Sequence, residues 1–147
     1  MKLVPTLRAL AGALSLAALA ACSDATGGNR VPVSFNNIGV PLAGTPPFTA
    51  GSSASGTVTI YGTYTYGGCD SPKPTARVDG GDLVFRLELK HDTEHACPGF
   101  IAVSGYRADI SGLAPGTYHV RVEHAGMAAA GEPIGDGVRL EQDVTVQ

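Results

Sequence analysis

The strongest constraint on this fold is the alternation of apolar and polar residues in runs that end at glycine or proline. In residues 56–66 every second side chain is apolar except at Gly62, and the intervening positions are mostly threonine. A period of two places alternate side chains on opposite faces of a strand. We interpret Gly62 as a bulge or a close backbone approach. No stretch carries a sustained helical period, so we expect an all-β fold.

Several other segments show strand-like patterns between turn residues. The predicted strands are residues 31–36, 56–66, 75–78, 83–90, 100–110, 117–124 and 138–146. Asp79 to Asp82, with two glycines between them, predict a tight hairpin turn. Residues 67–74 and 91–99 are predicted loops, and the long connection 39–55 has room for a short edge strand. About seven strands at this spacing predict an antiparallel β-sandwich over residues 31–147.

One motif resembles a recurrent element of Ig-like and prealbumin-like sandwiches. Residues 110–124 read ISGLAPGTYHVRVEH, in which Pro115 fixes φ and Gly116 supplies a positive φ for a turn before a core strand. The flanking layout has Cys69 after a Tyr/Gly-rich strand, then a hairpin, then Cys97 before another strand. This layout is similar to that of small bacterial lipoproteins. The resemblance covers roughly residues 56–124; it implies a β-sandwich and implies no activity.

The N-terminus has the layout of an export signal. Lys2 and Arg8 precede an apolar run over residues 9–18, which is too short to span a bilayer. The sequence LAAC ending at Cys22 resembles a lipobox, the recognition motif of lipoprotein signal peptidase. The resemblance implies Sec export, removal of residues 1–21 as a signal peptide, and a diacylglyceryl thioether on Cys22, with a further acyl chain such as palmitate on the new amine.

The predicted address is the cell envelope, with the protein held to a membrane by lipid at Cys22. The next residue is Ser23 rather than Asp, which by the enterobacterial sorting rule favours the outer membrane of a Gram-negative cell. Residues 22–30 are small and polar and predict a flexible tether. The alternative is an ordinary secreted protein whose signal ends near a cysteine.

Charge excludes some partners. Removal of residues 1–21 takes away Lys2 and Arg8, leaving 8 basic and 13 acidic residues and a formal charge of −5. Such a chain has no basic patch for nucleic acid and no polybasic surface for anionic lipid. We expect the membrane contact to be the lipid anchor, with an envelope protein as a further partner.

The remaining cysteines, Cys69 and Cys97, predict a disulfide because the exported chain meets an oxidising compartment. Such a bridge would bring residues 67–74 and 91–99 to one end of the sandwich. Loops held on a rigid scaffold often carry binding sites. We therefore expect any recognition surface to lie there.

The histidines offer the main alternative function, a periplasmic metal-binding lipoprotein. His91 and His95 flank Asp92 and Glu94 in one predicted loop, and such side chains bind Zn²⁺ or Cu²⁺. The loop lacks the helical period that would bring an H-x3-H pair together. Alternation places His119 outward and gives His124 an inward position. We predict no cofactor.

Catalytic and carbohydrate-binding patterns are weak. A hydrolase could use Ser104, His95 and Asp109 as a triad, but the sequence has no nucleophile elbow. Asp79 and Asp82 are the candidate carboxylate pair for glycoside cleavage, but a role in forming the predicted turn is the simpler interpretation. Three tyrosines could form a sugar-binding platform, or pack across strands: Tyr61, Tyr64 and Tyr66. We expect a non-enzymatic binding or structural module; a small hydrolase or a protease inhibitor is the other alternative.

Overall fold

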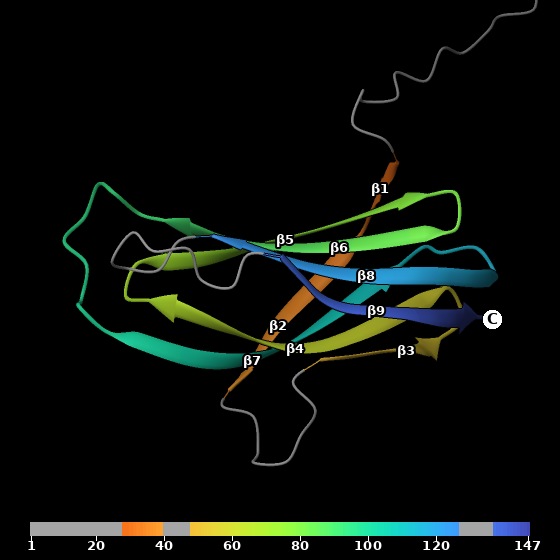
Figure 1. Ribbon diagram of the computed structural model, residues 1–147, viewed down its shortest axis with the longest axis horizontal. Helices are drawn as coiled ribbons and strands as arrows, with labels where there is room; N and C mark the ends of the chain where they lie inside the picture. The colour runs from red at the N-terminus through yellow and green to blue at the C-terminus, as the bar shows by residue number, and fades with distance from the viewer. Residues whose placement is uncertain (1–27, 40–47, 127–136) are drawn as a thin grey trace, which may run out of the picture.

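The computed structural model of the chain describes residues 28–39, 48–126 and 137–147, which form two sheets packed face to face (Figure 1). Within these ranges no helix is long and apolar enough to cross a membrane. The predicted signal peptide, residues 1–21, and Cys22 lie outside the described residues. The strands are β1 Asn29–Val31, β2 Val33–Gly39, β3 Thr49–Ala54, β4 Thr57–Gly67, β5 Asp70–Asp79, β6 Asp82–His91, β7 Ile101–Ser111, β8 Gly116–Gly126 and β9 Gly137–Val146.

The two sheets confirm the predicted sandwich. Five strands form one sheet in the order β1-β5-β6-β8-β9, and four form the other in the order β2-β7-β4-β3. All strand pairs are antiparallel except β6–β8, which are parallel because the chain crosses to β7 in the opposite sheet between them. The described strands number nine, compared with the seven expected.

The additional strands arise at the N-terminal half. β3 is the short edge strand expected within residues 39–55. The predicted first strand is interrupted at Pro32, so that β1 pairs with β5 in one sheet and β2 pairs with β7 in the other. Proline lacks the N–H that a continuous ladder needs, which suits this change of sheet. β1 begins at Asn29, so the expected tether, residues 22–30, overlaps its first two residues.

The prediction of a loop over residues 67–74 is wrong for most of this range, because β5 begins at Asp70 and includes Pro72 and Pro74. Both prolines pair in register with β6, opposite Leu89 and Leu87. On its other side β5 meets β1 only from Ala76 onward. Prolines fit a strand where the missing N–H points to an open side, so the sequence pattern for a loop was misleading here.

The core lies between the sheets and follows the alternation of the strands. The largest fully buried side chains come from both sheets: Tyr106, Phe85, Ile60, Leu83, Leu87, Ile110, Val58, Val120, Val122 and Val146. Of the two interpretations of Gly62, a bulge or a close backbone approach, the structure supports the close approach, because a Cβ at Gly62 would overlap the phenol of Tyr106. The absent side chain on β4 therefore makes room for the largest buried side chain, on β7.

The turn before β8 is stabilised by the strand that follows it. The hydroxyl of Tyr118 donates a hydrogen bond to the carbonyl oxygen of Ala114, at 2.9 Å. Gly116 has a φ of 158°. A tyrosine that bonds back to the backbone a few residues upstream is a recurrent corner of Ig-like sandwiches, and it holds the start of β8 against the core.

Candidate functional site

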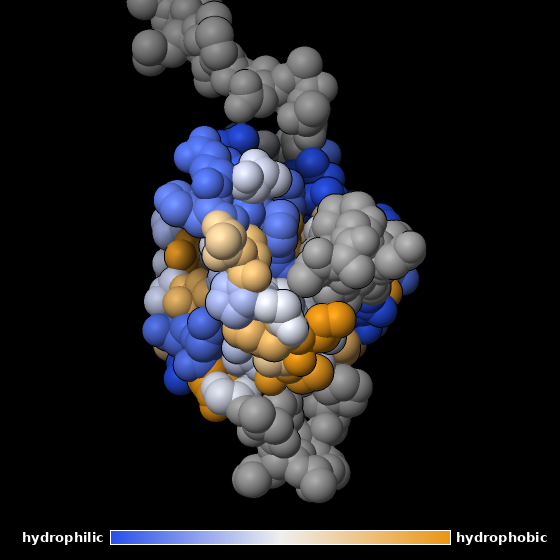
Figure 2. Space-filling view, turned by 90° about the vertical axis from the view of Figure 1, so that its left-hand side faces the viewer, coloured by the Kyte–Doolittle hydropathy of each residue, from blue (hydrophilic) through white to orange (hydrophobic). Residues whose placement is uncertain are grey.

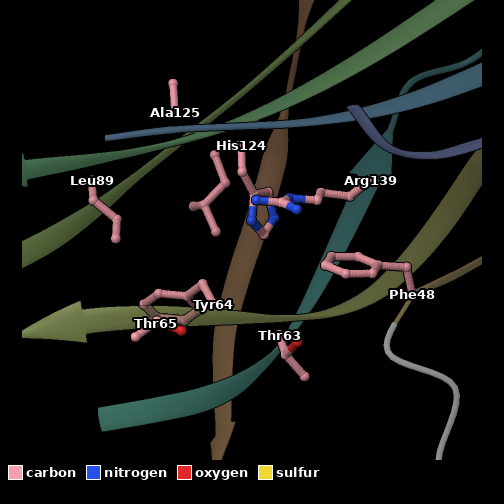
Figure 3. Close-up of a pocket in the computed structure, with 9 residues that line it drawn as sticks. Phe48, Thr63, Tyr64, Thr65, Leu89, His124, Ala125 and Arg139 are labelled. Atoms are coloured by element: carbon pink, nitrogen blue, oxygen red, sulfur yellow. The ribbon is translucent and has the colours of Figure 1, made fainter. Parts of the chain in front are cut away.

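A pocket of about 270 Å³ opens at one edge of the sandwich, where β3 stops pairing with β4. β3 pairs with β4 up to the Thr49–Tyr61 register, and no other described strand continues along this edge. The pocket lies between the second half of β4 and the ends of β6 and β8 (Figure 3). Its lining residues are Phe48, Thr63, Tyr64, Thr65, Leu87, Leu89, His124, Ala125 and Arg139.

His124 is a buried polar side chain of the pocket. Its Nε2 lies 3.1 Å from the hydroxyl of Tyr106, which comes from the opposite sheet. The ring of Phe48 packs edge-on against the imidazole, with centroids 5.3 Å apart. Burial lowers the pKa of His124 to about 4, and the positive charge of Arg139 adds to the shift. At neutral pH the imidazole is therefore uncharged, and burial raises the pKa of the Tyr106 phenol, which is also neutral.

The described lining of the pocket combines an apolar wall with the guanidinium of Arg139. Leu87 and Leu89 from β6 face Tyr64 on β4, and the Tyr64 hydroxyl bonds to Asn37 Oδ1 at 2.8 Å. Arg139, near the start of β9, extends toward the His124 ring (Figure 3). Among the described residues that line the pocket there is no aspartate or glutamate. An apolar wall with a few converging polar groups is typical of small-molecule sites.

The predicted disulfide is confirmed and lies at the same end of the molecule. Cys69 and Cys97 are bonded, with Cα atoms 5.4 Å apart. The amide of Asp92 donates to the Cys69 carbonyl at 3.1 Å, which joins the segment after β6 to the β4–β5 turn. The two connections therefore meet at one end, as expected, although the first of them is short.

The two histidines proposed as metal ligands hydrogen-bond to separate carboxylates. His91 Nδ1 lies 2.7 Å from Oδ1 of Asp70, a fully buried carboxylate, and His95 Nδ1 lies 2.7 Å from Oδ2 of Asp92. The backbone amide of Glu94, with further help from His95, lowers the pKa of Asp92. In the described part of the chain no three His, Cys, Asp or Glu side chains form a group that could hold a metal ion.

His119 lies on the outer face of the five-stranded sheet, as alternation predicted. Its Nδ1 is 2.8 Å from Oδ1 of Asp143 on β9. This hydrogen bond raises the pKa of His119. Asp79 and Asp82, the hairpin residues, border the same polar depression as His119, and their backbones pair across the Gly80–Gly81 turn. Their position fits the predicted role in the turn.

The nominated hydrolase residues do not come together. Ser104 is buried and bonds to the carbonyl of Gly105, whereas Asp109 is half-buried and pairs with Arg107 at 3.0 Å. Both residues lie on β7, and their odd separation in the strand puts them on opposite faces. His95 lies in the connection before β7, bonded to Asp92.

The three tyrosines of β4 do not share one platform. Tyr61 is exposed on the outer face, whereas Tyr64 is buried in the core and packs against Tyr66 with centroids 5.5 Å apart. Tyr66 meets Phe100 edge-on at 6.2 Å. Cross-strand and core packing, the simpler of the two interpretations, describes Tyr64 and Tyr66.

Apolar side chains are also exposed near the start of β7. Phe100, Ile101 and Val103 are each close to half exposed or more, with Ile101 at 62%. Figure 2, which looks onto this end, shows apolar side chains gathered in its lower half and hydrophilic ones above. In register, Val103 lies beside Thr65 of β4, so this cross-strand pair is uncharged.

Sequence reasoning identified His124 as inward-facing but missed its partners. Tyr106, Phe48 and Arg139 lie on separate segments, and no local spacing connects them. The one detectable clue was Gly62, whose missing side chain marks where Tyr106 fits. Comparison with protein-family models, curated proteins and solved structures finds no match for this chain.

Proposed function

We propose that this protein is a lipid-anchored module of the bacterial cell envelope that binds a small ligand in the pocket beside His124 and catalyses no reaction. The observation that carries the proposal is the pocket itself, about 270 Å³ with an apolar wall and converging polar groups. Pockets of this kind are few in a small domain.

The path of the chain supports presentation of the pocket away from the membrane. Gly28, immediately before β1, packs against the backbone of Val78 beside the β5–β6 hairpin. Leu89 and His124 line the pocket and lie toward the ends of β6 and β8, away from that hairpin. Figure 1 shows that these strand ends and the β5–β6 hairpin lie on opposite sides of the molecule. The segment from Cys22 to Gly28 spans at most about 25 Å when fully extended. The hairpin side therefore stays near the bilayer, and the pocket end is turned outward.

The chemistry of the pocket supports binding rather than catalysis. The Nε2 of His124 is engaged by Tyr106, and burial keeps the ring uncharged at neutral pH. The described lining offers two threonine hydroxyls but no serine, cysteine or carboxylate to form a nucleophile with its base. The side chains around the pocket can position a ligand, and none of them is arranged to activate one.

Anchoring is tested by intact-mass measurement of the protein from membrane fractions. We expect a chain that starts at Cys22 and carries acyl chains, and an inhibitor of lipoprotein signal peptidase should cause uncleaved precursor to accumulate. The Cys22→Ser variant should lose the acyl mass and leave the membrane fraction. Normal processing in the presence of the inhibitor would contradict the anchor.

Ligand binding is tested by methyl NMR of Leu87 and Leu89, whose side chains form the pocket wall. Small aromatic probes should shift these methyl signals and leave that of Leu113, which lies in the turn before β8, unchanged. Ala125→Phe, which places a ring at the pocket border, should abolish the shifts. Unchanged Leu87 and Leu89 signals at millimolar concentrations of every probe would reject the proposed binding role.

A further inference from the structure

The second half of β4 presents an open strand edge beside the pocket. β3 pairs with β4 only as far as the Thr49–Tyr61 register, and among the described strands none pairs with that side of β4 over residues 62–67. On its other side β4 stays paired with β7 as far as Gly67. Alternate residues of this stretch therefore turn their backbone N–H and C=O groups toward the open side, where another strand could bond to them.

The lining of the pocket shows that this edge borders it, and not only one face of β4. Thr63, Tyr64 and Thr65 are consecutive and all line the pocket, although successive side chains of a strand point to opposite faces. Tyr64 is buried in the core, whereas the Thr63 side chain points away from the His124 ring (Figure 3). A cavity that all three residues border lies along the edge of the strand.

The opposite wall supplies apolar side chains at the spacing of a strand. Leu87 and Leu89 are alternate residues of β6, and both pack toward the core. A strand added beside β4 would turn every second side chain toward them. The pocket is about 270 Å³, and an apolar cavity of about 150 Å³ accommodates benzene. It therefore has room for one side chain of the size of leucine or phenylalanine.

The segment of this chain that precedes β3 is poorly suited to extend the ladder. Pro46 and Pro47 come directly before Phe48 in the sequence, and proline has no backbone N–H. Two consecutive prolines remove the donors from both sides of an extended chain, so whichever of them faced β4 would lack its hydrogen bond. A complete ladder on this edge requires a strand without proline at these positions.

A second copy of this chain is also poorly suited to the pocket. Two copies paired edge to edge would each present β4, whose inward side chain Tyr64 is already buried in its own core and bonded to Asn37. The second copy would therefore bring no free apolar side chain to fill the pocket. A strand of a different polypeptide can satisfy the edge and the pocket together.

We infer that a short extended segment of another polypeptide pairs antiparallel with β4 over residues 63–67, in the direction of β3, and inserts one apolar side chain against Leu87 and Leu89. This inference rests on the proposed binding function and names its ligand. In strand addition the backbone hydrogen bonds give affinity and the side-chain pocket gives specificity. The outward side chains of the added strand lie beside Thr63 and Thr65, which favours threonine or valine there.

Three short peptides test the inference on the processed chain purified from cells, in lipid nanodiscs if it is acylated, with empty nanodiscs as the blank. The first, acetyl-KTLTLTK-amide, alternates leucine with threonine. The second is the same peptide with N-methyl groups on two consecutive central residues, which removes the donors from both of its sides. The third has aspartate in place of each leucine.

Two readouts separate the edge from the pocket. The methyl signals of Leu87 and Leu89 report the pocket, and amide hydrogen exchange over residues 62–67 reports the strand edge. We expect the first peptide to shift the methyl signals and to slow exchange of the amides that face away from β7. The other two should bind roughly ten- to hundredfold more weakly, since backbone hydrogen bonds or the apolar side chain are lost.

Leu89→Ala should weaken binding of the first peptide roughly tenfold, since the pocket wall loses apolar contact area. Val84→Ala is the matched control, because Val84 is a half-buried residue of β6 on the opposite face from Leu89. The control should bind as the wild type does. The N-methylated peptide tests the edge on the wild-type chain, where folding is not altered.

The outcomes separate the two proposals. Equal binding of the first and the N-methylated peptide would overturn strand addition, as would protection in the free chain of the residue 62–67 amides that face away from β7. A dimer of the free chain that the peptide dissociates would make a second copy the occupant and overturn it too. Shifts caused by small aromatic probes but not by the peptide would overturn this inference alone. Failure of both kinds of probe to move the Leu87 and Leu89 signals would overturn the binding function itself.

Discussion

The hydroxyl of Tyr106 and the Nε2 atom of His124 lie 3.1 Å apart, joining the two sheets from β7 to β8 in the interior of the sandwich. The contact gives each of these two buried polar atoms a hydrogen-bond partner. Because neither ring is charged at neutral pH, it avoids the cost of a buried ion. The same imidazole borders the pocket, so the stability of the core and the properties of the candidate site depend on one side chain.

His124 should make the protein sensitive to mild acid. Its pKa is about 4 in the folded state and about 6.5 when exposed, so between these values the unfolded chain binds more protons. The contribution of His124 to the free energy of unfolding is therefore complete above pH 6.5. It is lost as the pH drops toward 4, and the loss amounts to about 3 kcal/mol in all. Urea unfolding at several pH values measures this slope.

His124→Gln should flatten the slope between pH 4 and 6.5, whatever its effect on stability at neutral pH. His119→Gln is the control, since His119 is exposed and its pKa is raised by Asp143. Its contribution is present below the unfolded pKa and is lost as the pH rises through the folded pKa, so the acid slope should not change. An acid slope retained in His124→Gln would contradict the assignment.

Gly62→Ala should destabilise the fold by about 1–3 kcal/mol, because the added methyl group meets the buried ring of Tyr106. Gly51→Ala on β3 is a matched control, since a Cβ there meets no atom within 4 Å. It should change the free energy of unfolding by no more than about 0.5 kcal/mol. Equal effects at the two glycines would argue against the close approach of β4 and β7.

Tyr118→Phe should cost about 1 kcal/mol, because the Ala114 carbonyl loses its donor while the ring keeps its packing. Tyr61→Phe serves as the control, since Tyr61 is exposed on an outer face. Denaturant unfolding of both variants measures the difference. A neutral Tyr118→Phe would mean that the corner does not stabilise the turn.

The Cys69–Cys97 bond should contribute about 3–4 kcal/mol through loop closure. The double variant Cys69→Ala/Cys97→Ala should lower the urea midpoint and keep the same fold. The pairing of β4 with β7 and of β5 with β6 does not depend on the bond. Circular dichroism should show the same strand content. Loss of the β signal would indicate that the core alone cannot hold the sandwich.

Several elements follow directly from sequence pattern. The alternation in residues 56–66 corresponds to β4, the Asp79–Asp82 turn joins β5 to β6, and the hidden edge strand is β3. Pro72 and Pro74 misled the prediction, because proline usually ends a strand. Here β5 tolerates them since β1 covers only its last part.

The candidate site was less accessible from sequence. His124 was predicted to face inward, and it does. Its contact with Tyr106 depends on how β7 and β8 sit in opposite sheets, and the approach of Arg139 depends on where β9 begins. Neither relationship has a fixed spacing along the chain.

The sequence by itself determined the all-β class, the inward and outward faces of most strands, the turns and the cysteine pair, since these depend on local backbone geometry and on residue type. Only the tertiary structure decided which sheet each strand joins, the parallel β6–β8 pair and the pocket. The physical reason is that long-range packing decides which strands pair. The apolar face of one strand could pack against many others, and the fit of side-chain volumes selects one arrangement. The fit of Tyr106 over Gly62 is an example.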